Sequence, residues 1–270
     1  MAGPNHIPPA AGPADCDESC GMFGQEPFLL LVIALAVLLG GFVKGVVGIG
    51  LPIVSIGVLS SVIDAHFALG IIMFPLMFTN LWQMLHAGRP LAVIRRFWPL
   101  MASMLICIWV GTHLVTRLPG ASLYGFIGAA VVLFTTANYF TPDWHLPARS
   151  ERWAAPIAGA LSGLLGGIST IWGPPLTMLF FMIRLPKEAF IQATGTIWFA
   201  ASIPLLMGYR QNGILDDSTA VLSLAACLPS FVGQWVGTWV RARIEQESFR
   251  KVLLIVFFLI GLNLIRRALF

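Results

Sequence analysis

Long apolar runs recur from one end of the chain to the other and restrict it to one class of fold. Eight of the runs have 16 to 22 residues, and 57% of the 270 residues are hydrophobic while only 10% are charged. A soluble globular domain has about 25% charged residues, and a helix needs about 20 apolar residues to cross a bilayer. A transmembrane β-barrel would instead show alternating segments of about ten residues. The sequence therefore predicts an all-α polytopic membrane protein.

Ten apolar segments are expected to be helical, and two of them are too short to span a bilayer. The long segments are 28–45, 66–86, 97–116, 122–140, 153–168, 190–208, 219–240 and 250–268. The short segments, 51–62 and 174–184, each follow a glycine-rich break. A helix of 11 or 12 residues rises about 17 Å, against a hydrocarbon core of about 30 Å. Each short helix must therefore begin or end inside the membrane.

The two halves of the chain resemble each other, which indicates an internal duplication. The offset between matching residues rises only from 118 to 126 along the chain. The matches are GVVG at 45–48 with GLLG at 163–166, Pro52 with Pro174 and Pro175, and VGT at 110–112 with VGT at 236–238.

The basic residues favour halves of inverted topology. If every segment reverses the chain and the N-terminus lies outside, 12 of the 16 Lys and Arg residues fall on the cytoplasmic side. If each short segment instead forms one broken span with the segment before it, and Lys44 is left aside, the other 15 divide 7 against 8. Cytoplasmic loops carry an excess of basic residues. We therefore expect two inverted-topology repeats of about five membrane segments each, with eight long spans plus two short broken half-helices.

Four regions follow from this reading. They are a disordered N-terminal tail (1–27), a first transmembrane repeat (28–140), a linker loop (141–152) and a second transmembrane repeat (153–270). Two tail cysteines, Cys16 and Cys20, are compatible with a disulfide or with two free thiols.

The chemistry of the two breaks points to an anion site. Both breaks end in proline where a new helix starts, and free N–H groups at a helix N-terminus favour an anion. The candidate donors are the backbone at Gly48, Gly50, Gly166 and Gly167, the hydroxyls of Ser169 and Thr170, and the ammonium of Lys44. The alternatives are that the glycines only allow close helix packing and that Lys44 snorkels to the cytoplasmic surface.

Further candidates lie in the segments that directly follow the short ones. Asn80 and Gln83 are three residues apart and share a helix face, and Thr194 and Thr196 occupy the matching segment of the second half. For each of them the alternative is a hydrogen bond between helices. Trp172 lies inside the second break, away from the membrane interface, and is expected to form a wall or lid of the cavity.

Several function classes find no support in the sequence. No Asp or Glu lies well inside a span, so a buried carboxylate relay for protons is not expected. No Walker-type loop, catalytic triad or Cys/His metal spacing is present. The chain is therefore not expected to be an enzyme, to carry a cofactor or metal, or to bind nucleic acid.

The breaks carry a family resemblance. GFVKGVVGIGLP (41–52) and GALSGLLGGISTIWGPPL (159–176), followed by LPKEAFIQATGTIW (185–198), resemble the TauE/SafE family of sulfite and organosulfonate exporters. The resemblance covers residues 28–268. It implies a carrier of the bacterial inner membrane that exports small sulfur-containing or related anions.

The sequence thus predicts a secondary transporter that works by alternating access, with a small anionic substrate and the lipid bilayer as its partners. The alternatives are a passive anion channel and a non-transporting membrane scaffold subunit. The oligomeric state is left open.

Overall fold

The computed structural model describes residues 27–88, 90–118, 146–241 and 243, with scattered positions between 122 and 136 and between 258 and 266. Within these residues the chain is helical and contains no strand. The helices are α1 (Pro27–Val47), α2 (Leu51–Leu59), α3 (Ala65–Ile71), α4 (Met73–Ala87), α5 (Pro90–Val115), α7 (Ala148–Ser169), α8 (Gly173–Met182), α9 (Lys187–Gln211), α10 (Asp217–Ala225) and α11 (Cys227–Arg241).

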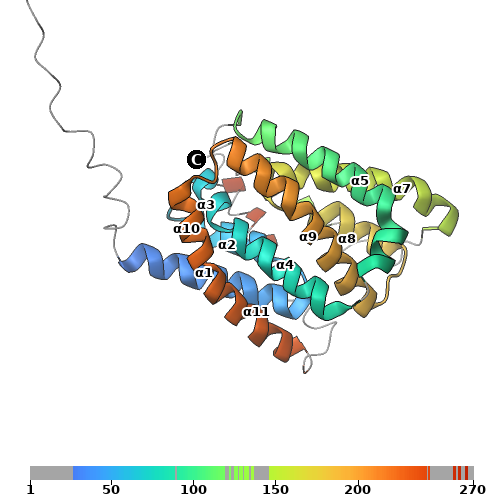
Figure 1. Ribbon diagram of the computed structural model, residues 1–270, viewed down its shortest axis with the longest axis horizontal. Coiled ribbons are helices and arrows are strands. Elements are labelled where there is room, and N and C mark those ends of the chain that lie inside the picture. The colour runs from blue at the N-terminus through green and yellow to red at the C-terminus, as the bar shows by residue number, and fades with distance from the viewer. Residues whose placement is uncertain are drawn as a thin grey trace, which may run out of the picture.

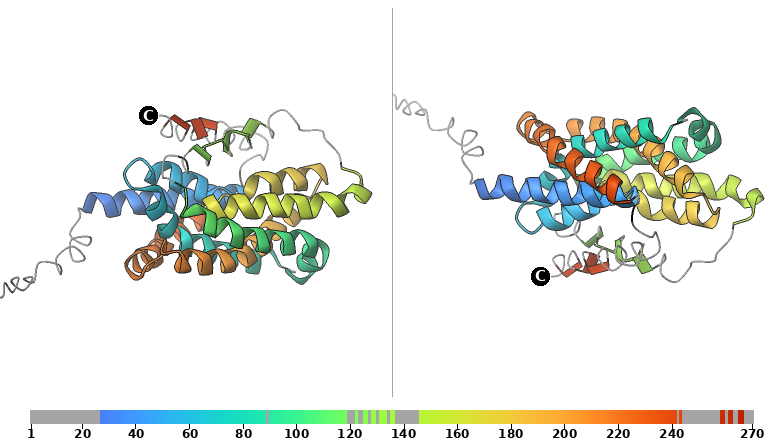
Figure 2. Two further views of the ribbon diagram at one scale, coloured as in Figure 1. Left: turned by 90° about the horizontal axis from the view of Figure 1, so that it is seen from above. Right: turned by 90° about the horizontal axis from the view of Figure 1, so that it is seen from below.

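The two glycine-rich breaks lie near the centre of the molecule. Helices α1 and α7 enter from opposite ends and stop where they approach each other (Figure 2). Helix α2 turns back along α1, and the Ser55 Oγ donates a hydrogen bond to the Ala36 carbonyl at 3.2 Å. Helix α8 packs against α7 in the same manner. Each half therefore contributes a helical hairpin whose tip lies in the interior.

The remaining helices surround these two hairpins. Helix α4 packs on α9, α5 packs along both α7 and α9, and α11 packs along α1 (Figure 1). Two of the long segments are interrupted once. Helix α3 ends at Ile71 and α10 ends at Ala225, each four residues before a proline, Pro75 and Pro229. A proline lacks the N–H that would bond to that carbonyl and its ring crowds it, so the helix is deformed there without losing its direction.

The prediction of an all-helical membrane protein is confirmed. Among the described residues, five helices are long and apolar enough to cross a membrane: Pro27–Val47, Ala65–His86, Pro90–Val115, Glu188–Gln211 and Asp217–Arg241. Helix α7 is 22 residues long, but it begins with a charged turn at 149–152 inside the expected linker loop and does not belong to these five. Helices α2 and α8, with 9 and 10 residues, are as short as the sequence predicts.

Some expectations fall on other parts of the chain. The segments 122–140 and 250–268 lie largely outside the described residues, and the tail with Cys16 and Cys20 lies entirely outside them. The eight long spans and the inverted relation of the halves therefore stay predictions.

Glycines allow two helix pairs to pack backbone to backbone. A Cβ on Gly45 of α1 would lie 2.9 Å from the Cα of Gly237 in α11. A Cβ on Gly167 of α7 would lie 2.8 Å from the Cα of Gly111 in α5. Small residues at such contacts are the usual means of joining helices in a membrane. The pairs α1–α11 and α5–α7 are therefore closely packed seams.

Gly159 of α7 tests the seam away from the central breaks. A Cβ there would collide with the backbone of Leu100 in α5, and overpacking of this kind costs about 1–3 kcal/mol. We expect Gly159→Ala to lower the thermal unfolding midpoint in detergent. Gly173→Ala is the control, because a Cβ at Gly173 meets no atom within 4 Å. An equal or higher midpoint for Gly159→Ala would contradict close packing at the seam.

An exposed carboxylate fixes the start of α10. The Asp216 Oδ1 accepts a hydrogen bond from the Thr219 N–H at 2.8 Å, and the Ser218 hydroxyl donates to Oδ2 at 3.0 Å. Hydrogen bonding, chiefly from Thr219, lowers the pKa of Asp216 below its ordinary value. Because the folded pKa lies below the unfolded one, this contribution to stability is present at neutral pH and is lost as the pH falls through the folded pKa.

Loss of this cap has a predictable cost. We expect Asp216→Ala to lower the free energy of unfolding by about 1 kcal/mol at pH 7, with a smaller difference from the wild type near pH 3. Asp216→Asn keeps an acceptor and is expected to stay close to the wild type at pH 7. Denaturant titration in detergent at both pH values measures this. A deficit for Asp216→Ala that does not shrink in acid would exclude the carboxylate as its cause.

Candidate functional site

The chain reverses at each break through residues with positive φ. Gly48 has a φ of 86° and Gly50 a φ of 112°, which glycine adopts without steric cost. In the second break the corresponding turn falls on Thr170, with a φ of 60°. A threonine in this region is uncommon and is sustained only where its surroundings hold it.

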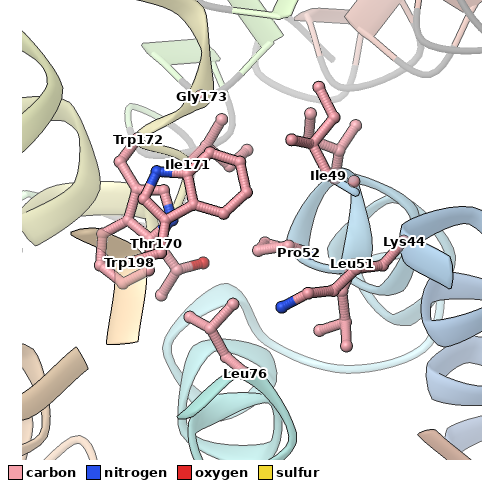
Figure 3. A pocket seen from close by; sticks show the side chains of 12 residues that line it. Lys44, Ile49, Leu51, Pro52, Leu76, Thr170, Ile171, Trp172, Gly173 and Trp198 are labelled. Carbon is pink, nitrogen blue, oxygen red and sulfur yellow. The ribbon is translucent and has the colours of Figure 1, made fainter. Parts of the chain in front are cut away.

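The two reversals face each other across one small cavity (Figure 3). About 20 Å³ is open to the centre of a water-sized sphere, which is room for about one water molecule. The lining residues are Lys44, Ile49, Gly50, Leu51, Pro52, Ile53, Leu76, Thr170, Ile171, Trp172, Gly173 and Trp198.

Aromatic rings form one wall of this cavity, and an ammonium lies opposite. The indoles of Trp172 and Trp198 stack with centroids 6.5 Å apart and planes at 28°. The side chain of Lys44 reaches in from the other side, with its nitrogen directed toward the Thr170 hydroxyl (Figure 3). The Trp198 Nε1–H is buried and has no partner among the described residues. The cavity therefore combines apolar walls with unused donors.

Lys44 is held by neutral acceptors. Its side chain is 2% exposed, and its Nζ donates to the Thr79 Oγ1 at 2.9 Å and to the Asn80 Oδ1. These two acceptors use both protons of a neutral amine, and the protonated ammonium has a third donor. No carboxylate of the described residues pairs with Lys44, and its amine points inward, so it does not snorkel to the surface.

The acceptors of Lys44 belong to a chain of polar contacts between helices. The Asn80 Nδ2 donates to the Ser202 Oγ at 3.4 Å, which joins α4 to α9. One turn further on, the Gln83 Nε2 donates to the Thr194 Oγ1 at 2.9 Å and to the Ile191 carbonyl at 3.0 Å. These contacts position Asn80, and Asn80 in turn holds the Lys44 amine at its place between the helices.

The two helix N-termini at the cavity are not equivalent. Neither α2 nor α8 has a side-chain cap. Within the first three residues, α2 offers the amides of Leu51 and Ile53, whereas α8 offers only that of Gly173 because Pro174 and Pro175 have no N–H. The start of α2 therefore offers more backbone donors than the start of α8.

The structure brings some of the expected site residues together and leaves others apart. Lys44, Gly50, Thr170 and Trp172 line the cavity, while Asn80, Gln83 and Thr194 form the adjoining polar chain. Gly48 lies beside Gln83, since a Cβ on Gly48 would lie 3.7 Å from the Gln83 Nε2.

Four further expected residues lie outside both the cavity lining and the adjoining polar chain. Gly166 packs against the indole of Trp172, and Gly167 lies in the seam with α5. The Ser169 hydroxyl donates to the Leu165 carbonyl at 2.7 Å, and the Thr196 hydroxyl donates to the Gln192 carbonyl at 2.9 Å. The Thr170 hydroxyl does line the cavity but donates to the Ser169 carbonyl at 2.5 Å. These hydroxyl protons are therefore used by the local backbone.

A second pocket, which we call the vestibule, leads from the surface to Lys44. It offers about 90 Å³ to a water-sized sphere and is lined by Lys44, Gly45, Trp82, Gln83, His86, Glu188, Ile191, Gln234, Thr238 and Arg241. Sequence reasoning did not select His86, Glu188 or Arg241 as site residues. The one feature of the sequence that could have indicated them is that all three lie at helix ends on the same predicted side of the membrane.

The fold defines a class, that of multi-pass α-helical membrane proteins, and paired broken helices are typical of transporters. A family model described as sulfite exporter TauE/SafE matches residues 33–264. The chain therefore belongs to the TauE/SafE sulfite exporter family, as its motifs suggest. The comparison with curated proteins and the comparison with solved structures found no match.

Removal of one acceptor of Lys44 is expected to destabilise the fold. Asn80→Ala leaves a buried ammonium and the Ser202 hydroxyl short of a partner, which costs about 1–3 kcal/mol. We expect a correspondingly lower midpoint in denaturant unfolding. Thr196→Ala is the control, because it removes only a bond within α9. Equal effects of the two variants would exclude a special role for the contact between Asn80 and Lys44.

Proposed function

We propose that this protein is a secondary carrier that exports a small sulfur oxyanion or organosulfonate across the bacterial inner membrane by alternating access. The observation that carries the proposal is the buried amino group of Lys44, which faces the cavity between the two breaks without a carboxylate partner among the described residues. A charge buried in this way is costly unless a counter-charge reaches it. An anionic substrate provides that counter-charge.

The packing of the helices supports inverted repeats. If the two halves are equivalent, α1 corresponds to α7 and α11 corresponds to α5. The α1–α11 seam should then have a matching α7–α5 seam, and both seams are present. The contact between Asn80 and Ser202 joins residues 122 apart, which lies within the 118 to 126 offset of the repeat. Short broken helices at matching places in inverted halves are typical of substrate sites in secondary transporters.

The available donors fit an oxyanion. They are the third proton of Lys44, the Trp198 Nε1–H and the amides of Leu51 and Ile53 at the start of α2. A sulfite or sulfonate group presents only acceptors when it is fully ionised, so it matches donors that come from several directions. The aromatic wall formed by Trp172 and Trp198 suits a short carbon chain attached to such a group.

The size of the cavity favours a carrier over a channel. About 20 Å³ holds a water molecule but not a sulfonate, so the hairpin tips must separate before the substrate binds. A channel needs a continuous polar lining, whereas here the cavity and the vestibule are separate spaces that share Lys44. Among the described residues no Asp or Glu is buried, which argues against a carboxylate relay for proton coupling.

Replacement of Lys44 tests the proposal. We expect Lys44→Met to lower the rate of sulfite or sulfoacetate counterflow in proteoliposomes at least ~10-fold, equivalent to ~1.4 kcal/mol. Methionine of similar length removes the charge without leaving a large cavity, so the thermal midpoint is expected to be retained or raised. Counterflow in Lys44→Met that equals that of the reference variant Thr196→Ala would contradict a role of Lys44 in binding the anion.

Binding can be measured independently of transport. In a thermal-shift panel of sulfite, sulfoacetate, acetate and chloride at equal ionic strength, a ligand at 100 times its Kd adds about 2.7 kcal/mol of stability. We expect stabilisation by the sulfur anions but not by acetate, and its loss in Lys44→Met. The same shift with all four salts would contradict a specific site.

A further inference from the structure

The vestibule has one exposed and one buried end. Its exposed end carries His86 and Glu188, and its buried end carries Lys44 and Gln83. Between them its wall is polar, with Gln234 and Thr238 from α11. Lys44 also lines the central cavity, so the two spaces meet at this one side chain. A solute that enters from this surface reaches Lys44 before it reaches the tryptophan wall.

The mouth of the vestibule holds a cation, Arg241, that has no ion-pair partner in the described part of the chain. Arg241 lies in the last turn of α11 and is partly exposed. It forms no ion pair with a described carboxylate. Two residues further on, Arg243 differs, because its guanidinium lies over the Trp239 ring at 3.4 Å from the centroid and does not line the vestibule.

The wall also holds a polar atom without a partner. The Gln234 side chain is 4% exposed, and its Nε2 donates to the Thr79 carbonyl at 3.2 Å. This contact fixes the orientation of the amide, because a carbonyl accepts only from the NH₂ group. The Gln234 Oε1 is then left buried without a partner among the described residues.

We propose that the vestibule is the entrance for the substrate anion, with Arg241 as its capture site and the Lys44 ammonium as the group that receives the anion next. This inference rests on the proposed anion transport and adds its route of entry. The ligand is a small oxyanion that binds by charge at the mouth. Glu188, at the same mouth, opposes this attraction and keeps the capture weak enough for the anion to move on.

Three charge changes at one surface test the entrance. Counterflow of sulfite or sulfoacetate is measured against substrate concentration for Arg241→Gln, Glu188→Gln and Arg243→Gln. We expect Arg241→Gln to raise KM about fivefold or more with kcat within about twofold, since a charge at the rim acts mainly on encounter. Glu188→Gln is expected to lower KM. Arg243→Gln removes the same charge nearby and is expected to leave KM unchanged.

The salt dependence and the thermal midpoints complete the experiment. The difference between Arg241→Gln and the wild type is expected to shrink in 0.5 M salt, where charges are screened within about 4 Å. Midpoints equal to that of the wild type show that each variant is folded. Equal effects of Arg241→Gln and Arg243→Gln, or no effect of Arg241→Gln, overturn the proposed entrance. If the wild type still transports the anions, the proposed function is not affected by this result. A wild type that transports neither anion overturns the proposed function and the entrance together.

Accessibility gives a second readout that does not depend on a rate of transport. Thr238→Cys, in a full-length background with the four native cysteines replaced, places a thiol on the vestibule wall. We expect a sulfonate-bearing thiosulfonate reagent to label it, and sulfoacetate to slow that labelling in the presence of Arg241 more than in Arg241→Gln. A thiol that does not react, or that sulfoacetate fails to protect, overturns the entrance even if the KM values shift.

Discussion

The buried amino group of Lys44 is the constraint on which the interior of this protein depends. Two neutral acceptors, Thr79 and Asn80, hold it, and Asn80 is held in turn by Ser202 of α9. Neutral hydrogen bonds satisfy the donors of an ammonium but do not cancel its charge, so much of the desolvation cost remains. In the proposed function, an anion supplies the missing counter-charge, and this would link binding to the closure of the hairpin tips.

Glycine serves two separate purposes within the same short motifs. Gly45 and Gly167 are helical and let neighbouring backbones touch, whereas Gly48 and Gly50 have positive φ and turn the chain. Both uses are needed in one place, because the seams hold the ends of α1 and α7 firmly while the turns direct the next helices into the cavity. The alternative that glycines only permit packing is thus correct for some positions and insufficient for others.

The sequence predicts the broken helices well because their signals are local. Gly/Pro runs end a helix wherever they occur, and an apolar segment of about ten residues is short in any context.

The residues of the site are harder to predict, because the direction of a side chain depends on how its helix is rotated in the bundle. Ser169 and Thr196 look like donors in the sequence, but their protons bond to carbonyls one turn earlier. Trp198 and Arg241 show the converse, because a tryptophan in an apolar segment and an arginine at a helix end have common structural explanations. Only the packing of α9 and α11 brings the Trp198 indole to the cavity and Arg241 to the mouth of the vestibule.

The two proposed repeats carry different chemistry, and this difference gives the site a polarity. With an offset of 118 residues, Lys44 corresponds to Ser162, which is buried and whose hydroxyl has no partner among the described residues. With an offset of 126, Gln234 and Arg241 correspond to Ile108 and Val115, both fully buried. Two polar positions of the vestibule, Gln234 and Arg241, thus have apolar counterparts in the first proposed repeat, whereas Thr238 corresponds to Thr112. In the proposed transport, the anion is attracted from the side of Arg241, which the distribution of basic residues predicts to be cytoplasmic, and it meets no matching cation at Ile108 and Val115. If the halves are inverted repeats, as we propose, they provide two routes of equivalent geometry, and the substitutions at these positions would make one of them the route for capture and the other the route for release, which is the arrangement that the proposed export requires.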